Sequence, residues 1–458
     1  MAYTSFRKMR QRRRRAGQFG CGLLALVVGL IATAGGWALG QNPAIQDRLA
    51  PRLAALDEAW RGLQYGPQPE ALPTAAVALA APPTFAPAGA TTLPATPIAE
   101  QPTLAVTLAP TLTPAPTATL PPIPATLTLK GARYEPQLFN NCGPATLTAA
   151  LVFWGWRGSE VDSLNWYGNG VDVRWQRDVA AIVKPGARDK NVSPEELTAF
   201  VTQRAGLGAA LRFGGDLERL KRLIAAGFPV IIERGFLEDE HGQEGKGWEG
   251  HYGLLTGYDD ASAEFITQDS YIGANYRRAY DLIERDWRAF NNLYIVLYPP
   301  NREAELLALL GADADVAANL DSALAQAQAD AAAVRDPEQE ALAWHNVGAV
   351  LFRQGRADEA VVAFDQARSF DTLPRRLLWY RHDMYAAYFE AGRYQDVIDL
   401  ADLMLQSPGL EESFYWRARA QDALGARATA VEDLRAALGE HPGWDPALEQ
   451  LAAWGAAP

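Results

Sequence analysis

The sequence is short of cysteine and histidine. Its 458 residues include two cysteines, Cys21 and Cys142, and five histidines. The soluble part of the chain holds only one of the cysteines, which excludes a disulfide framework there. No cluster of His and Cys has the spacing of metal ligands, so the sequence indicates no metal and no cofactor. A lone thiol in a large soluble region is most often an inert buried side chain, and Cys142 therefore needs support from its surroundings before any chemistry is assigned to it.

Acidic residues are absent from residues 1–20, although this stretch contains seven Lys and Arg. The whole chain carries a net charge of −12, so the remainder carries −12 − 7 = −19. A strongly acidic body repels phosphate backbones and anionic lipid surfaces. This charge balance argues against nucleic acid as a partner.

Charge of either sign is missing from residues 19–39, an apolar run of about the length that a bilayer-spanning helix needs. The basic tail at 1–18 predicts a cytoplasmic N-terminus, with everything after Gly40 on the outer side of the cell membrane. A cleaved signal peptide is the competing interpretation, because Ala38-Leu39-Gly40 is a passable cleavage site. The run is long for a signal peptide, so we expect a single-pass transmembrane helix that anchors an extracytoplasmic body.

Two segments follow the apolar run. Residues 43–65 space Leu49, Leu53 and Leu56 at helical intervals, which predicts a short juxtamembrane amphipathic helix. Residues 66–127 are almost all Ala, Pro, Thr and Leu and hold half of the chain's 30 prolines. Such a composition cannot bury a core and removes backbone donors, so it predicts a disordered linker that extends away from the membrane.

Cys142 lies where an apolar helix is expected to begin. Residues Ala145 to Trp154 form the helix, and Pro144 suits its first turn. Free N–H groups and the helix dipole at this end lower the pKa of a thiol. Gln137 lies five residues upstream, close enough for its side-chain amide to form an oxyanion hole with the backbone N–H of Cys142.

His251 begins an apolar, strand-like run that ends at Asp259, and residues 264–270 return as a second strand. The hairpin register places Asp269 within about one residue of facing His251. A carboxylate there would orient the imidazole and stabilise its protonated form. The other histidine of this region, His241, lies in a polar, glycine-rich stretch before Trp248, which reads either as a mobile flap over a cleft or as a plain surface loop.

These segments resemble the C39-like peptidase family, a branch of the papain-like cysteine peptidases. The resemblance rests on Gln137-x4-Cys142-Gly-Pro and on Gly250-His-Tyr-x-Leu-x-x-Gly-Tyr-Asp259 followed by Asp269-Ser270. Further matching stretches are Lys190–Leu197, Gly214–Lys221 and Leu223–Glu233. The resemblance implies a papain-like α+β domain at 128–300, with Cys142 as nucleophile, His251 as base, Asp269 as its orienting carboxylate and Gln137 in the oxyanion hole.

Residues 301–458 are expected to be helical throughout. Glycines at 355, 392 and 425 recur close to the 34-residue tetratricopeptide period. Together with apolar residues at matching offsets, they resemble a tetratricopeptide-like array, whose members often hold a peptide or a partner protein in a groove. Packing against the peptidase domain is the equally weighted alternative.

The sequence therefore predicts a membrane-anchored cysteine peptidase that acts on a peptide or protein substrate outside the cytoplasmic membrane. An amidase or transpeptidase acting on cell-wall peptides with the same triad is the nearest alternative among enzymes. A non-catalytic peptide-binding scaffold is the alternative from another class, but the presence of all four catalytic residue types argues against it.

Overall fold

A computed structural model describes residues 49, 52, 53, 55, 56, 70–75, 122–158, 174–186, 189–237, 247–407 and 409–458. The predicted basic tail at 1–18 and the predicted transmembrane helix at 19–39 lie outside these residues. Within the described part, no helix is both long and apolar enough to cross a bilayer. In the segment 43–65, the five described residues are helical, and Leu49, Leu53 and Leu56 are exposed.

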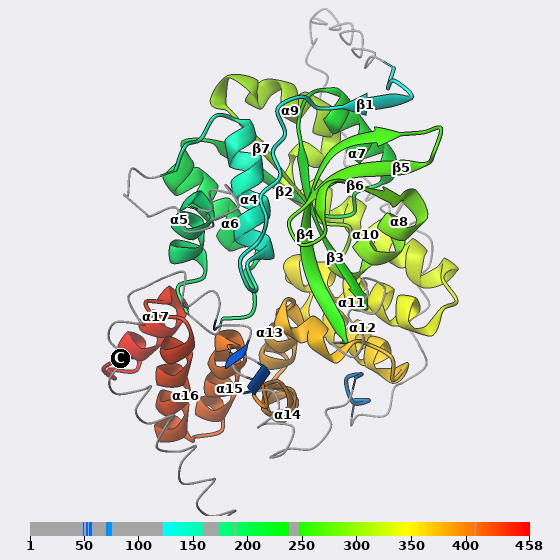
Figure 1. The fold of residues 1–458 in the computed structure, drawn as a ribbon. Coiled ribbons are helices and arrows are strands. Elements are labelled where there is room, and N and C mark those ends of the chain that lie inside the picture. The colour runs from blue at the N-terminus through cyan, green and yellow to red at the C-terminus, as the bar shows by residue number, and fades with distance from the viewer. Residues whose placement is uncertain are drawn as a thin grey trace, which may run out of the picture. The chain divides into compact units, whose positions relative to one another are not determined.

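A seven-stranded antiparallel sheet forms the framework of residues 122–300 (Figure 1). Its strands are β1 (Thr126–Thr128), β2 (Gly208–Arg212), β3 (Val230–Leu237), β4 (Trp248–Asp259), β5 (Glu264–Asp269), β6 (Gly273–Ala279) and β7 (Tyr294–Tyr298). Their order is β2-β7-β3-β4-β5-β6, and β1 also pairs with β4. Successive side chains of a strand face opposite sides, so Val230 and Ile232 of β3 enter one core and Ile231 enters the other.

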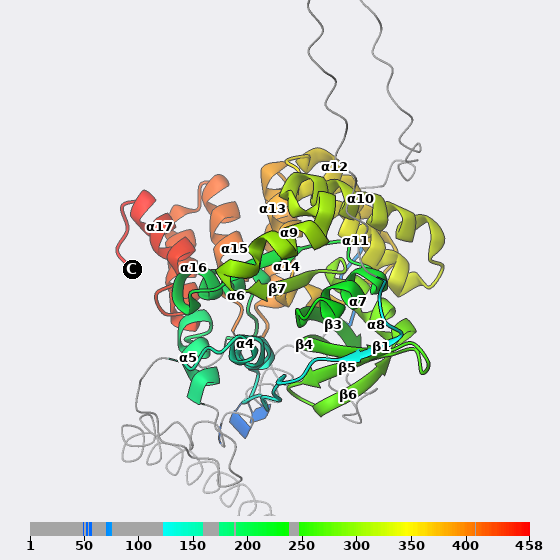
Figure 2. The same ribbon diagram turned by 90° about the horizontal axis from the view of Figure 1, so that it is seen from above.

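Helices cover both faces of this sheet. They are α4 (Cys142–Phe153), α5 (Arg174–Val183), α6 (Pro194–Phe200), α7 (Leu217–Ala225) and α8 (Tyr280–Trp287). A short π-helix at Val201–Ala205 continues α6, and a 3-10 helix at Arg288–Phe290 continues α8. Helix α4 packs beside β4 (Figure 2) and buries Leu147 and Leu151 in the core that contains Ile231. Helices α7 and α8 bury Leu223 and Ile283 against the other face. The mixture of helices with an antiparallel sheet confirms the predicted α+β class for this part of the chain.

The chain is helical after the sheet, as predicted for 301–458. The helices are α9 (Glu303–Leu310), α10 (Val316–Ala333), α11 (Pro337–Arg353), α12 (Ala357–Ser369), α13 (Asp383–Glu390), α14 (Tyr394–Met404), α15 (Glu411–Ala423), α16 (Arg427–Glu440) and α17 (Asp445–Ala453), with 3-10 turns at Pro300–Arg302, Gly311–Ala314 and Arg375–Trp379. Gly355, Gly392 and Gly425 stand in the turns α11–α12, α13–α14 and α15–α16, with φ of 76°, 72° and 87°. Their recurrence follows from this left-handed turn conformation, which favours glycine. The tetratricopeptide assignment itself stays a prediction.

The C-terminal helices pack directly on the sheet domain. One continuous core contains Phe290 of the sheet domain together with Leu342 and Phe364 of α11 and α12. Tyr380, in the segment before α13, places its ring 5.9 Å from that of Phe290 and 6.2 Å from that of Trp248. Trp248 is buried at the start of β4 and belongs to this core.

Part of the predicted disordered linker at 66–127 is ordered. In Glu70–Ala75, the backbone N–H of Leu72 donates to the carbonyl of Leu373 over 2.8 Å, and that of Arg375 donates to the carbonyl of Glu70 over 2.8 Å. The Leu72 side chain is fully buried among the C-terminal helices. The prediction of disorder is therefore wrong for these residues, because an average composition hides one apolar side chain with a complementary site elsewhere in the chain.

Candidate active site

Cys142 is the first residue of α4 and is half-buried. The sulfur accepts a hydrogen bond from the backbone N–H of Tyr252 on β4. No side chain fits at the next position, because a Cβ on Gly143 would lie 2.3 Å from Cγ1 of Val192. Tyr252 also donates its hydroxyl hydrogen to the carbonyl of Val192 over 3.0 Å. The helix start and β4 thus position the thiol, and the segment at Val192 packs against both.

His251 connects the thiol to a carboxylate. Its Nε2 lies 3.0 Å from Oδ1 of Asp269, and the imidazole also hydrogen-bonds the Cys142 thiol. Because Nε2 faces the carboxylate, Nδ1 is the ring nitrogen left for the sulfur. The structure therefore brings Cys142, His251 and Asp269 together in the order predicted from the sequence.

The register of the β4–β5 hairpin differs from the prediction. Leu254 pairs with Gln268, so the continuing register puts Asp269 beside Gly253, two residues along from His251. A bulge between Leu255 and Gly257 shifts the pairing by one residue, which brings Asp269 one position closer to His251 than the register before the bulge would. The carboxylate still reaches the imidazole diagonally.

Asp269 is held by four donors. Oδ1 accepts from His251 and from the backbone N–H groups of Tyr271 and Ile272, at 3.0 and 3.1 Å, and Oδ2 accepts from Arg234 at 2.8 Å. Burial disfavours a charged carboxyl, but the charge and hydrogen bond of His251, followed by the Arg234 guanidinium, outweigh it and hold the pKa of Asp269 well below its usual range. The carboxylate is therefore a permanent anion behind the imidazole.

The electrostatics favour an ion pair between His251 and Cys142. Burial lowers the pKa of His251, but Asp269 and the hydrogen bond to Cys142 outweigh burial and raise that pKa to about 9. Burial likewise raises the pKa of the Cys142 thiol, yet the hydrogen bond and charge of His251 bring this pKa below its ordinary value. A thiolate beside an imidazolium is the form that attacks a carbonyl carbon.

Gln137 lies next to the end of β5. Its backbone N–H donates to the carbonyl of Ser270 over 2.9 Å, and its Oε1 accepts the Ser270 hydroxyl hydrogen over 2.9 Å. This bond fixes the amide and leaves Nε2 as the donor that the predicted oxyanion hole requires.

Sequence reasoning missed two charged residues of β3. Arg234 stands opposite His251 in the β3–β4 backbone pairing, and its buried guanidinium forms an ion pair with Asp269. Glu233 is buried near Cys142, and burial, with the thiolate charge, raises its pKa well above the usual value. The available signal was an adjacent Glu and Arg inside an otherwise apolar strand, because buried charges need partners. His241 lies outside the described residues.

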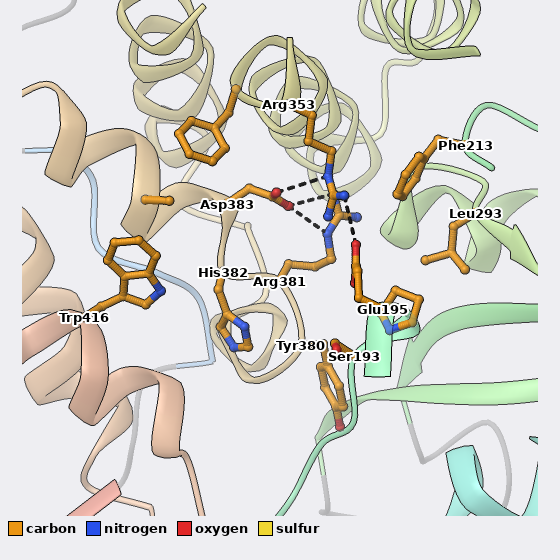
Figure 3. A pocket seen from close by; sticks show the side chains of 13 residues that line it. Ser193, Glu195, Phe213, Leu293, Arg353, Tyr380, Arg381, His382, Asp383 and Trp416 are labelled. Atoms are coloured by element: carbon orange, nitrogen blue, oxygen red, sulfur yellow. Dashed lines mark hydrogen bonds and ion pairs between the residues drawn. The ribbon is translucent and has the colours of Figure 1, made fainter. Parts of the chain in front are cut away.

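A separate cavity of about 230 Å³ lies where α6 meets the C-terminal helices (Figure 3). In Figure 3, Arg353 lies between Glu195 and Asp383, at 2.9 and 3.2 Å, and Arg381 also contacts Asp383. Trp416 lies on the opposite wall. Because these charges pair with one another, the cavity by itself does not indicate a charged ligand.

Two comparisons with known proteins found similarities to this chain. Residues 129–296 match the model of the Peptidase_C39 like family. A solved C39-like peptidase from Bacillus anthracis is 16% identical, with 38% of this chain and 96% of that chain covered and a TM-score of 0.28. No curated protein matches the chain. The residues that match the family model include Gln137, Cys142, His251 and Asp269.

Proposed function

We propose that the chain is a membrane-anchored, extracytoplasmic cysteine peptidase. The carrying observation is the hydrogen-bonded series Cys142–His251–Asp269 inside a region that matches a peptidase family. The predicted anchor at 19–39 would leave the sheet domain and the C-terminal helices outside the membrane. The predicted linker at 66–127 would separate the anchor from the sheet domain.

The reaction follows from the ion pair. The Cys142 thiolate attacks the carbonyl carbon of a peptide bond, and the Gln137 amide and the backbone N–H of Cys142 donate to the resulting oxyanion. The His251 imidazolium gives its proton to the leaving amine as the C–N bond breaks, which leaves an acyl thioester. His251 then removes a proton from water, the hydroxide attacks the thioester, and collapse of this intermediate releases the acid and regenerates the ion pair.

Thiol labelling and peptide hydrolysis test this mechanism together. In the full chain, a peptidyl electrophile should modify Cys142 much faster than it modifies a free thiol, and Cys142→Ala and His251→Ala should abolish hydrolysis. Cys21→Ala is the matched control, because it removes the only other thiol and should change neither rate. Labelling of Cys142 at the rate of a free thiol, unaffected by loss of His251, would show that the site is not catalytic.

We propose in addition that the C-terminal helices dock the substrate or a partner protein. The cavity beside α6, which Phe352, Arg353 and Trp416 of these helices line, supports this role. The Cys142→Ala chain should retain substrate peptides, and Trp416→Ala in the same background should weaken that retention. Equal retention would place docking elsewhere.

Alkaline extraction tests the predicted anchor. It should leave the full chain in membranes and release a chain that begins at Gln41.

A further inference from the structure

Three side chains with metal-ligand chemistry meet between the sheet domain and the C-terminal helices. They are Asp189, which precedes α6, Glu411, the first residue of α15, and His441, which follows α16. One ligand atom from each lies within 4.8 Å of the other two. All three residues are buried, with exposed fractions of 2%, 1% and 6%.

The distances suit coordination of one ion. Nδ1 of His441 lies 2.9 Å from Oε1 of Glu411 and 3.5 Å from Oδ2 of Asp189. Ligands that bind a transition metal at about 2.1 Å are separated by about 3.0 Å at an octahedral corner and about 3.4 Å at a tetrahedral one. The observed spacing needs little adjustment to reach either geometry.

A second observation points to a ligand. Oε2 of Glu411 is buried and has no hydrogen-bond partner among the residues that the structure describes. Burying a carboxylate oxygen without a donor or a cation is costly, and a metal ion would remove that cost.

We propose that Asp189, Glu411 and His441 bind one divalent transition metal ion, of the class to which Zn²⁺ and Mn²⁺ belong. One imidazole nitrogen with carboxylate oxygens suits these ions, whereas Ca²⁺ and Mg²⁺ take oxygen ligands alone. Two carboxylates balance the charge of the ion, and His441 binds as the neutral imidazole. The sequence offered no such signal, because the ligands come from segments far apart in the chain.

The site is structural, and it supports the candidate active site at a distance. Val192, three residues after Asp189, packs on Gly143 and accepts the hydroxyl of Tyr252. An ion that ties Asp189 to α15 and to the end of α16 therefore fixes the segment that holds the start of α4. No step of the hydrolysis passes through the ion.

Metal content and thermal stability test the proposal in the full chain. The Cys142→Ala background is used, since the thiol and His251 also attract Zn²⁺. After chelation and dialysis against Zn²⁺ or Mn²⁺, we expect about one retained ion per chain and a higher melting temperature than in the metal-free chain. His441→Ala and the isosteric Glu411→Gln should each lose the ion and the rise in melting temperature.

Three controls separate this site from other causes. Glu359→Gln removes an exposed carboxylate and should keep the ion. His251→Ala should keep it as well, which would exclude the candidate active site as the binding place. Arg188→Met removes a cation next to Asp189 in sequence, outside the described residues, and should also keep the ion.

Circular dichroism of the metal-free variants shows whether they fold. The proposal is overturned if the parent chain retains no ion, or if Glu411→Gln retains as much as the parent. In that case His441 is held by its contacts with the two carboxylates alone. Neither result tests whether Cys142 hydrolyses peptides, which the thiol labelling and hydrolysis experiment measures separately.

Discussion

Arg234 and His251 face each other across the β3–β4 pairing, and both side chains bind the carboxylate of Asp269. The guanidinium takes one oxygen and the imidazole takes the other. This shared anion couples the stability of the sheet to the protonation of the candidate base. The predictions below test that coupling and the parts of the fold that depend on it.

Activity should depend on pH through the ion pair. The rate of Cys142 alkylation should rise with pH through a pKa below the ordinary thiol value, because His251 stabilises the thiolate. Peptide hydrolysis should fall as pH rises through about 9, where His251 loses the proton that the leaving amine needs.

In Asp269→Asn, loss of the carboxylate charge should move the alkaline fall to lower pH. An unshifted alkaline limb would show that Asp269 does not raise the pKa of His251.

The free energy of unfolding should also fall as pH rises through the pKa of His251. The folded pKa of His251 lies above its unfolded value of 6.5, so its contribution is complete below pH 6.5 and is lost as pH rises through about 9.

Removing Arg234 should destabilise the fold. Arg234→Met leaves Asp269 buried without its guanidinium partner, and the free energy of unfolding in urea should fall by about 3–5 kcal/mol. The deficit should shrink at acid pH, where the carboxyl takes up a proton. Arg222→Met is the control, because Arg222 forms a partly exposed pair with Glu218 and should cost less than about 0.5 kcal/mol. Similar losses in the two variants would contradict a buried ion pair.

Gln137 should act on the transition state. Gln137→Ala removes an oxyanion donor, and we expect kcat to fall by roughly 10²–10³ while KM changes little. Ser270→Ala frees the Gln137 amide without removing it, so a loss of about 1 kcal/mol, or roughly fivefold in kcat, is expected. Gln326→Ala, an exposed amide on α10, should leave both constants unchanged. A fall in kcat/KM that comes from KM alone would place Gln137 in substrate binding.

The ordered piece of the predicted linker should contribute to stability. Leu72 is fully buried against the C-terminal helices, so Leu72→Ala should lower the free energy of unfolding by about 2–5 kcal/mol. Leu307→Ala, on the exposed side of α9, should change it by less than about 0.5 kcal/mol. Chemical denaturation of the two variants measures the difference. Equal, small effects would mean that Glu70–Ala75 does not hold to these helices in solution.

Local patterns in the sequence were sufficient for several elements. The apolar run after Cys142 specified α4, and the turn residues between two strand-like runs specified the β4–β5 hairpin. The recurring glycines marked the turns between paired helices. Each helix, hairpin and turn was predicted from residues within or next to it, because helix periodicity and turn chemistry are short-range properties.

The sequence by itself therefore determined the α+β class of the sheet domain and the candidate roles of Cys142, His251 and Asp269. Only the tertiary structure decided what surrounds them. Arg234 reaches Asp269 because a bulge sets the register, and Leu72 finds its site on helices 300 residues away. Asp189, Glu411 and His441 meet for the same reason: burial and charge pairing depend on packing between distant segments, which no local pattern encodes.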